Sequence, residues 1–312
     1  PSVAPMALDI GVHLPQLGRG ASRKALIDFC TEADRLGIHS GWTSDHIAWP
    51  ADISSKYPYT EDGSFPAPND IAWLDPIGTL LFVAGITENM RLGQTVLIMG
   101  YRPPVQTAKL MATLDVVSEG RAILGAGVGW MREEFEVLGM PYDNRGARAD
   151  EQLEIFHKLF TEETPSYDGR FYSFPEIRFE PKPIQGRIPV WVGGASEAAF
   201  RRTARFGDCF HAAFEPLDTV AAEWSRVQEL VDDAGRDRSE VTLSIRLYLD
   251  PAANMKPAVS IAGSAEQMID TVGDWVAIGV DHILVDITAP GGPSGRLEAL
   301  QGFMSDVVPN VG

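Results

Sequence analysis

Cysteine is nearly absent from this chain of 312 residues, which contains only Cys30 and Cys209. The two positions form no spacing typical of a disulfide framework or a metal site. Cys30 falls on the apolar face of an expected helix and Cys209 at the start of an expected strand, so we expect two buried free thiols. Unpaired cysteines are typical of a reducing compartment, which predicts a cytoplasmic protein.

Basic residues are also few. The chain has 26 lysines and arginines against 43 aspartates and glutamates, which gives a net charge of -17. This balance disfavours binding to a nucleic acid backbone over a wide surface, although a small anion site made of backbone amides and one or two arginines is compatible with it. The N-terminus, PSVAPMALDI, lacks a signal-peptide layout, and no apolar run is long enough to cross a bilayer, so we expect no membrane contact.

Motifs of three common kinds of site are missing. The chain has no HxH or HExxH pair, and His13, His46 and His211 are scattered, so we predict no metal site. It has no GxSxG nucleophile elbow, which argues against a serine hydrolase. The segment GAGVGW carries Trp130 where the dinucleotide-binding fingerprint needs its third glycine. Three large classes of protein are therefore disfavoured.

The most informative segment that is present is RAILGAGVGWMREE, at 121–134. Its apolar residues 122–124 predict a short buried parallel strand. The glycines that follow, Gly125, Gly127 and Gly129, allow backbone to approach a ligand with no Cβ in the way. We interpret the segment as a strand that brings main chain to a flat cofactor. The pattern by itself is equally compatible with a glycine-lined turn that holds no ligand.

Short apolar runs and longer runs with helical spacing alternate along the whole chain, which predicts an α/β protein. Eight such alternations without a break in composition favour one (β/α)8 TIM barrel, with residues 1–312 as a single domain. The expected strands are 8–14, 40–43, 91–98, 122–124, 188–193, 208–212, 241–249 and 282–285. The expected helices are 22–37, 75–86, 103–118, 145–161, 197–206, 217–233, 265–278 and 296–307. Excursions follow strands 2, 4 and 7, at 47–73, at 166–186, where Asp168-Gly169 predicts a hairpin turn, and at 250–263.

Ligands of such barrels bind at the carboxyl ends of the strands, so the residues that follow each strand are candidates for a site. Asp45 and His46 follow strand 2, and histidine titrates near neutral pH, which makes the pair a candidate for acid-base chemistry. The alternative is that His46 only caps a loop. Aromatic residues predict a roomy apolar pocket, although part of the set is equally compatible with the core. They are Trp42, Trp49, Trp73, Trp130 and Phe214.

A second candidate site follows strand 5. Gly193, Gly194, Ala195 and Ser196 lie between this strand and a helix that starts near Glu197. Unpaired amides and the positive end of the helix dipole converge there, which predicts a phosphate site. Arg201 and Arg202 follow one turn later and either add charge or remain solvated. An ordinary capped loop is the alternative.

These residues carry a resemblance to a known family. The chain resembles the bacterial-luciferase-like flavin and deazaflavin oxidoreductases, and within them the branch that uses the deazaflavin coenzyme F420. The similarity covers nearly the whole chain, from DIGVHLPQ through SDHI to GVDHILV. Its most specific part is LDVVSEGRAILGAGVGWMREEF followed by RGARADE.

The resemblance implies roles for individual positions. Asp45 and His46 match a pair beside the reactive ring, and Trp49 matches an aromatic residue that shapes the substrate side. Thr95 and Val96 match a peptide that is usually cis and contacts the back of the ring. Further matches are Gly127, Val128 and Gly129 at the ring and ribityl chain, and Gly193 and Gly194 at the phosphate. Apart from these matches, His13, Trp130 and Phe214, which follow strands, are the expected substrate-pocket residues.

Two departures from the sugar-phosphate dehydrogenases of this family affect the expected substrate. Trp130 stands where they carry a glutamate, and no lysine lies near Glu215. We therefore expect a small apolar or aromatic substrate, a hydride transferred between it and C5 of coenzyme F420, and His46 as proton partner. The alternatives are an FMN-dependent monooxygenase and a non-catalytic flavin-binding barrel. The family resemblance also implies a homodimer.

Overall fold

A closed barrel of parallel strands forms the centre of the molecule. The computed structural model describes residues 8–60, 62–65 and 70–311, and within them eight parallel strands close into a ring. The order around the ring is β1 (Asp9–His13), β2 (Ser40–Thr43), β3 (Arg91–Gln94), β5 (Ala122–Gly127), β8 (Val190–Gly193), β9 (Cys209–Ala213), β10 (Thr242–Asp250) and β12 (His282–Ile287), which pairs again with β1. The predicted (β/α)8 barrel is confirmed.

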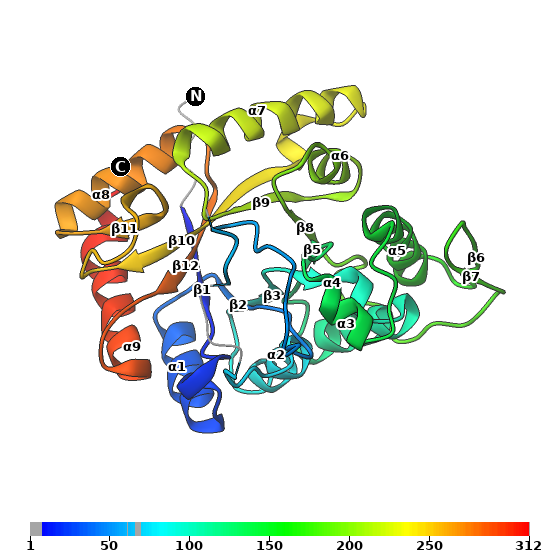
Figure 1. Ribbon diagram of the computed structural model, residues 1–312, viewed down its shortest axis with the longest axis horizontal. Helices are drawn as coiled ribbons and strands as arrows, with labels where there is room; N and C mark the ends of the chain where they lie inside the picture. The colour runs from blue at the N-terminus through cyan, green and yellow to red at the C-terminus, as the bar shows by residue number, and fades with distance from the viewer. Residues whose placement is uncertain (1–7, 61, 66–69, 312) are drawn as a thin grey trace.

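Helices surround the strands on the outside (Figure 1). They are α1 (Arg23–Arg35), α2 (Pro76–Ala84), α3 (Pro104–Val117), α5 (Arg145–Thr161), α6 (Glu197–Phe206), α7 (Leu217–Asp233), α8 (Ala265–Ala277) and α9 (Gly292–Gly302). Local signals explain where several begin: Ser22 caps α1 by accepting a hydrogen bond from the amide of Ala25, and Asp75 caps α2 in the same way. In the described part of the chain, no helix has the length and apolar character needed to span a bilayer.

The connections carry several smaller elements. The short helix α4 (Arg132–Val137) follows β5 and was not predicted. The hairpin of β6 (Tyr167–Asp168) and β7 (Ser173–Phe174) confirms the excursion expected there, and it projects from the side of the barrel in Figure 1. The excursion after β10 returns as β11 (Ser260–Ala262), which pairs with β10. Both cysteines are buried and free, as expected.

The third strand differs from the prediction. Residues 91–98 were expected to form one strand, but β3 ends at Gln94 and a separate strand, β4 (Leu97–Ile98), follows it. The Thr95–Val96 peptide between them is cis, as the family resemblance implied. β3 pairs with β5 at Leu92 and Gly93, and β4 pairs further along β5 at Ala126 and Gly127. The main chain therefore bulges between the two pairings.

The glycines of β5 and β8 make room for this bulge. A Cβ on Gly125 would lie 1.6 Å from the carbonyl oxygen of Gln94, and a Cβ on Gly127 would lie 2.1 Å from Cγ2 of Val96. A Cβ on Gly193 would lie 2.7 Å from Cγ1 of the same valine. The space of the missing side chains of Gly125 and Gly127 is therefore occupied by the neighbouring residues Gln94 and Val96, a reason for these glycines that the sequence did not indicate. β5 also continues to Gly127 instead of ending at Leu124.

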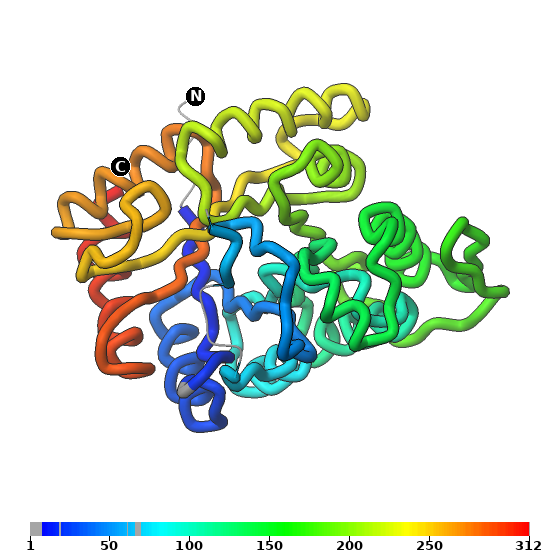
Figure 2. The backbone as a smooth tube through the Cα atoms, in the orientation of Figure 1, coloured from blue at the N-terminus to red at the C-terminus, as the bar shows by residue number. Residues whose placement is uncertain are grey.

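The excursion after β2 crosses the centre of the view in Figure 2. Hydrogen bonds from side chains of other segments hold this excursion in place. Oε1 of Glu133 accepts hydrogen bonds from the amides of Ser54 and Ser55, at 2.8 and 3.0 Å. Gln16 donates to the carbonyl oxygens of Ser44 and Leu74, at 2.8 and 2.6 Å. The excursion is therefore held at both ends and in its middle.

We predict that Gly125→Ala destabilises the protein by about 1–3 kcal/mol or more, the usual range for an overpacked core. The added Cβ would overlap a backbone carbonyl, which cannot rotate away as a flexible side chain does. Urea unfolding followed by tryptophan fluorescence measures the change. Gly273→Ala in α8 is the matched control, because a Cβ there meets no atom within 4 Å, and it should be neutral or slightly stabilising. Equal stability of the two variants would contradict the close approach of β3 and β5.

Candidate active site

A cavity of about 640 Å³ lies at the carboxyl ends of the strands. It brings together most of the predicted site residues, which come from five different strand ends: Asp45, His46, Thr95, Val96, Gly127, Val128, Gly129, Trp130, Gly193, Gly194, Ala195, Ser196 and Phe214. Residues that were given no role from the sequence complete its wall, among them Tyr57, Tyr59, Phe65, Arg145, Arg246 and Tyr248. The barrel topology explains this gathering, since all parallel strands end on the same side.

His46 is held by a buried carboxylate that the sequence did not identify. Its Nδ1 donates to Oε2 of Glu134 at 2.6 Å, and Glu134 is fully buried. The same carboxylate accepts hydrogen bonds from the amides of Ile47 and Ala48 and from the hydroxyl of Tyr101. Burial by itself raises the pKa of Glu134, but the hydrogen bonds from His46 and its other donors lower it below the ordinary value.

This pairing fixes the chemistry available to His46. A carboxylate on Nδ1 selects the tautomer in which Nε2 carries the lone pair. His46 lines the cavity, so Nε2 is the nitrogen that can accept a proton there and later return it. The alternative that His46 only caps a loop is less well supported, because its ring is oriented by a side chain from α4. The acidic run WMREE contained the only sequence signal for Glu134.

Asp45 has a mainly structural set of contacts. Its carboxylate accepts two hydrogen bonds from the guanidinium of Arg102, at 2.7 and 2.9 Å, and one from the amide of Ile98, at 2.9 Å. Burial raises the pKa of Asp45, and the pairing with Arg102 opposes that change. The side chain therefore positions the end of β4 at the cavity wall, next to His46.

His13 and Trp49 do not line the cavity, which corrects two expectations. His13 was expected in the substrate pocket, but its ring is buried and contacts Ser44 Oγ at 2.9 Å and the carbonyl oxygen of Leu14 at 3.0 Å. Burial lowers the pKa of His13 to about 4. Trp49 was expected to shape the substrate side, but it packs edge-on against His46, with ring centroids 4.7 Å apart. It supports the ring of His46 without reaching the cavity.

Aromatic side chains surround the cavity near His46. Trp73 packs edge-on against the His46 ring at 4.7 Å between centroids. Trp130 stacks with Phe65 at 6.1 Å and meets Tyr57 at 5.3 Å. Tyr57, Phe65 and Trp73 belong to the excursion after β2. Because the sequence of this excursion has neither helical nor strand periodicity, it did not indicate that the three rings face the same cavity. This part of the cavity is apolar, in agreement with Trp130, while Phe214 packs elsewhere in the cavity, against Tyr248 and the guanidinium of Arg246.

Other residues that line the cavity offer sites for an anion. Gly194 has a φ of 117°, which side-chain-bearing residues rarely adopt, and Ser196 caps α6 by accepting from the amide of Ala199. The first turn of α6 leaves amides without intrahelical partners. Arg145 also lines the cavity, and its Nε donates to the carbonyl oxygen of Gly129 at 3.0 Å.

The arginines that were considered for this anion site lie elsewhere. Arg201 pairs with Glu197 on the exposed face of α6. Arg202 is buried and donates to Asp150 and to the carbonyl oxygen of Gly146. Neither lines the cavity. The arginines that do line the cavity are Arg246, which is paired with Asp286, and Arg145 of α5, within the RGARADE segment.

A buried ion pair forms the cavity floor. Nη2 of Arg246 donates to Oδ2 of Asp286 at 2.7 Å, and Nη1 donates to the carbonyl oxygen of Thr95 at 3.1 Å. Burial by itself raises the pKa of Asp286, but Arg246 lowers it below the ordinary value. Oδ1 of Asp286 is buried without a hydrogen-bond partner among the described residues. A polar ligand group at the floor would satisfy this acceptor.

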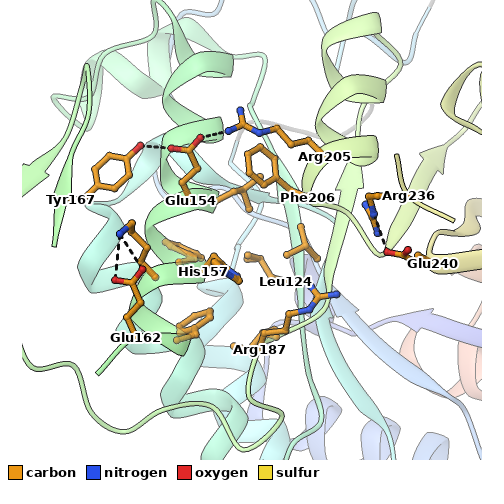
Figure 3. A pocket seen from close by; sticks show the side chains of 16 residues that line it. Leu124, Glu154, His157, Glu162, Tyr167, Arg187, Arg205, Phe206, Arg236 and Glu240 are labelled. Atoms are coloured by element: carbon orange, nitrogen blue, oxygen red, sulfur yellow. Dashed lines mark hydrogen bonds and ion pairs between the residues drawn. The ribbon is translucent and has the colours of Figure 1, made fainter. Parts of the chain in front are cut away.

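A second cavity, of about 560 Å³, lies outside the barrel between α5 and α6 (Figure 3). Its charged side chains are paired: Glu154 contacts both Arg205 and Tyr167, Lys158 contacts Glu162, and Arg236 contacts Glu240. Arg187 pairs with Asp208, which does not line the cavity. These groups are directed at each other and not at a shared ligand position. We therefore place the candidate active site in the barrel mouth.

The fold and the cavity in the barrel mouth define a (β/α)8-barrel protein with a candidate site at the carboxyl ends of its strands. Its family follows from the sequence: the model of the luciferase-like monooxygenase family matches residues 6–272, and the chain belongs to this family. An uncharacterized protein of Mycobacterium tuberculosis is 34% identical over 212 residues, which cover 67% of this chain and 72% of that protein. An F420-dependent glucose-6-phosphate dehydrogenase of Microbacterium testaceum is 30% identical over 224 residues, which cover 69% of this chain and 61% of that protein.

Solved structures share the fold over almost the whole chain. An F420-dependent secondary alcohol dehydrogenase in complex with an F420-acetone adduct superposes with a TM-score of 0.79 at 16% identity, covering 98% of this chain and 100% of that chain. A type II Baeyer-Villiger monooxygenase of Pseudomonas putida in complex with FMN superposes with a TM-score of 0.72 at 18% identity, covering 98% and 99%. At these identities the likeness concerns the fold.

We predict that Glu134→Gln lowers the free energy of unfolding by about 1–3 kcal/mol at pH 7, because the amide cannot accept all four hydrogen bonds. The pKa of Glu134 is lowered in the folded protein, so its contribution is complete above the unfolded-state pKa of about 4.3 and is lost as the pH falls through the folded-state pKa. The stability difference between wild type and variant therefore shrinks as the pH falls below about 4.3.

Urea unfolding at a series of pH values measures this difference. Glu136→Gln is the matched control, because Glu136 is exposed on the same helix and its loss should change stability by less than about 0.5 kcal/mol. A difference that stays constant at acidic pH would mean that Glu134 is not held as a carboxylate.

Proposed function

We propose that this protein is an oxidoreductase that uses the deazaflavin coenzyme F420 and acts on a small apolar or aromatic organic substrate. One observation carries the proposal: the same cavity is lined by the oriented His46 with its aromatic neighbours and by the N-terminus of α6 with Arg145. A ring that exchanges a hydride and a phosphate group joined to it need these two environments together.

The residues present fit a flavin-type cofactor. Such a cofactor has a flat tricyclic ring, a ribityl chain and a phosphate. The bulge at Thr95 and Val96 offers a wall for one face of the ring, and residues 127–129 continue along it. Gly194 to Ser196 and Arg145 would bind the phosphate. The buried, unpartnered Oδ1 of Asp286 adds an acceptor for a polar group of the ligand.

The chain's own residues would perform three tasks in the reaction. When bound, the cofactor supplies or takes up the hydride. His46 accepts or donates a proton at Nε2, and Glu134 keeps the ring in the tautomer that permits this. The aromatic side chains of the excursion after β2 exclude water from the reacting groups. Trp130 and Phe214 provide an apolar surface for the substrate.

The relatives support coenzyme F420 over FMN. Two F420-dependent glucose-6-phosphate dehydrogenases are similar to this chain in sequence, at 30% and 28% identity. The monooxygenase in complex with FMN is similar in fold, and its sequence is only 18% identical. Their sugar-phosphate substrate is not part of the proposal, because Trp130 and the absence of a lysine near Glu215 depart from that branch. An FMN-dependent monooxygenase is the second candidate, favoured by the family to which the chain belongs.

We predict that His46→Ala lowers kcat for substrate-dependent F420 reduction or oxidation by about 10²- to 10⁴-fold, the usual contribution of a general acid-base group. Cofactor affinity should be retained. A screen of secondary alcohols, unsaturated ketones and nitroaromatics, followed by the deazaflavin absorbance, measures turnover, and His157→Ala on the exposed face of α5 is the control. A protein that binds the cofactor but converts no substrate in either form would favour the non-catalytic barrel.

We predict that Arg145→Gln weakens binding of coenzyme F420 and of FMN by about tenfold, as expected when a charge-assisted hydrogen bond to phosphate is lost. Binding of riboflavin, which has no phosphate, should change little. Quenching of tryptophan fluorescence measures all three affinities, and Arg201→Gln is the control because Arg201 lies on the exposed face of α6. Wild-type protein that binds FMN at least tenfold more tightly than F420 would overturn the choice of cofactor.

A further inference from the structure

A chain of hydrogen bonds runs inside the barrel toward the candidate active site. Trp42 Nε1 donates to Ser40 Oγ at 2.8 Å, and Ser40 Oγ contacts His282 Nε2 at 2.8 Å. His282 Nδ1 contacts Ser244 Oγ at 2.8 Å, which contacts His211 Nδ1 at 2.9 Å. His211 Nε2 contacts Thr95 Oγ1 at 2.9 Å. The chain starts deep in the barrel and ends at a residue of the cavity wall.

Both histidines in the chain are neutral. His211 and His282 are buried, and their hydrogen-bond partners are uncharged hydroxyl groups. Burial lowers the pKa of His211 to about 3, with a further contribution from Arg246, and lowers the pKa of His282 well below its ordinary value. A neutral imidazole has one N–H donor and one acceptor nitrogen, so every contact in the chain has a defined direction.

The two ends of the chain decide this direction. Suppose first that Thr95 donates to His211: each following group then donates away from the cavity, and the hydroxyl proton of Ser40 is left over. Ser40 is fully buried, and its other partner, the indole N–H of Trp42, is only a donor. In this direction the proton has no acceptor among the hydrogen bonds of the described residues, which is unfavourable for a buried group.

In the opposite direction every buried donor has an acceptor. Ser40 donates to Nε2 of His282, whose Nδ1–H donates to Ser244, and Ser244 donates to Nδ1 of His211. Nε2–H of His211 then donates to Thr95 Oγ1. The remaining proton is that of the Thr95 hydroxyl, which lines the cavity. His211 lines the cavity as well, but both of its ring nitrogens are already paired within the chain of hydrogen bonds.

We propose that this chain directs the Thr95 hydroxyl proton into the cavity, where it donates to an acceptor atom of the bound ligand, and that His211 is the positioning residue that sets this direction. The guanidinium of Arg246 supports this direction, because its Nη1 lies 3.4 Å from Thr95 Oγ1 and can only donate, so it offers no acceptor for the hydroxyl proton. The carbonyl oxygen of Thr95 accepts from the same Nη1, and its amide donates to the carbonyl oxygen of Thr43, so the backbone is fixed as well.

The proposal specifies what the ligand presents at this wall. The group facing Thr95 is a carbonyl oxygen or an unprotonated ring nitrogen of a conjugated heterocycle, because an N–H group would meet a second donor there. In this form the inference rests on the proposed function, since the heterocycle is taken to be the cofactor. The direction of the chain itself depends only on the protein.

The direction of the hydrogen bonds is tested by nitrogen-15 NMR of the histidine rings in the full chain without ligand. We expect His211 as the Nε2–H tautomer and His282 as the Nδ1–H tautomer, with neither signal changing between about pH 5 and 8, because both rings remain neutral there. The signals are assigned from their loss in His211→Asn and His282→Asn, and from contacts to Thr95 and Ser40 in the wild type. The reverse tautomers, or titration of either ring in this interval, would overturn the proposal.

The ligand contact is tested with Thr95→Val, which keeps the shape of the side chain without its hydroxyl, and Thr95→Ser, which restores the hydroxyl. Affinities for FMN and coenzyme F420 come from tryptophan quenching, and the urea midpoint of each variant reports its fold. We expect affinity about tenfold lower in Thr95→Val and near wild type in Thr95→Ser, with the visible absorption band of the bound cofactor shifted only in Thr95→Val.

Unchanged affinity and spectrum in a folded Thr95→Val would refute the ligand contact. The two experiments also separate this inference from the proposed function. Wild-type protein that binds neither cofactor would count against the proposed function and the ligand contact together, while the histidine tautomers would still decide the direction of the chain.

Discussion

The mouth of the barrel depends on one buried carboxylate. Glu134 accepts hydrogen bonds from the ring of His46, from two amides of the following loop and from the hydroxyl of Tyr101. These donors come from the segment after β2 and from the turn after β4, while Glu134 itself lies on α4. A buried carboxylate without donors is strongly unfavourable, so the three segments must assemble together. The orientation of His46 is therefore a property of the whole mouth and not of its own loop.

The sequence predicted the barrel because the signals for it are local. Alternating apolar runs, helix caps at Ser22 and Asp75, and prolines at helix starts are each encoded within a few residues. The break between β3 and β4 is different. Residues 91–98 have the composition of a continuous strand, and the interruption requires Gly125, Gly127 and Gly193, which meet Gln94 and Val96 only after folding. A pattern read along one segment does not contain that information.

The same distinction explains which site residues were predicted. His46, Phe214 and the glycines after β8 directly follow strands, so the topology alone brings them to the cavity. Glu134 and Arg145 lie on helices, and Arg246 lies within β10, so their contribution depends on which way each side chain packs. His13 shows the reverse case, because it ends β1 in the expected place but turns to Ser44. The position of a residue at a strand end therefore predicted that it lies near the cavity, whereas packing determined where its side chain points.

The bulge at Thr95 and Val96 also has a stereochemical consequence. It covers one side of the cavity, and Val96 is wedged against Gly127 and Gly193, so this wall cannot retreat. If a planar cofactor rests on it, as proposed above, only the other face of that cofactor would remain accessible to a substrate. Any prochiral substrate must then approach from that single side, and the barrel would deliver one enantiomer of a newly formed stereocentre.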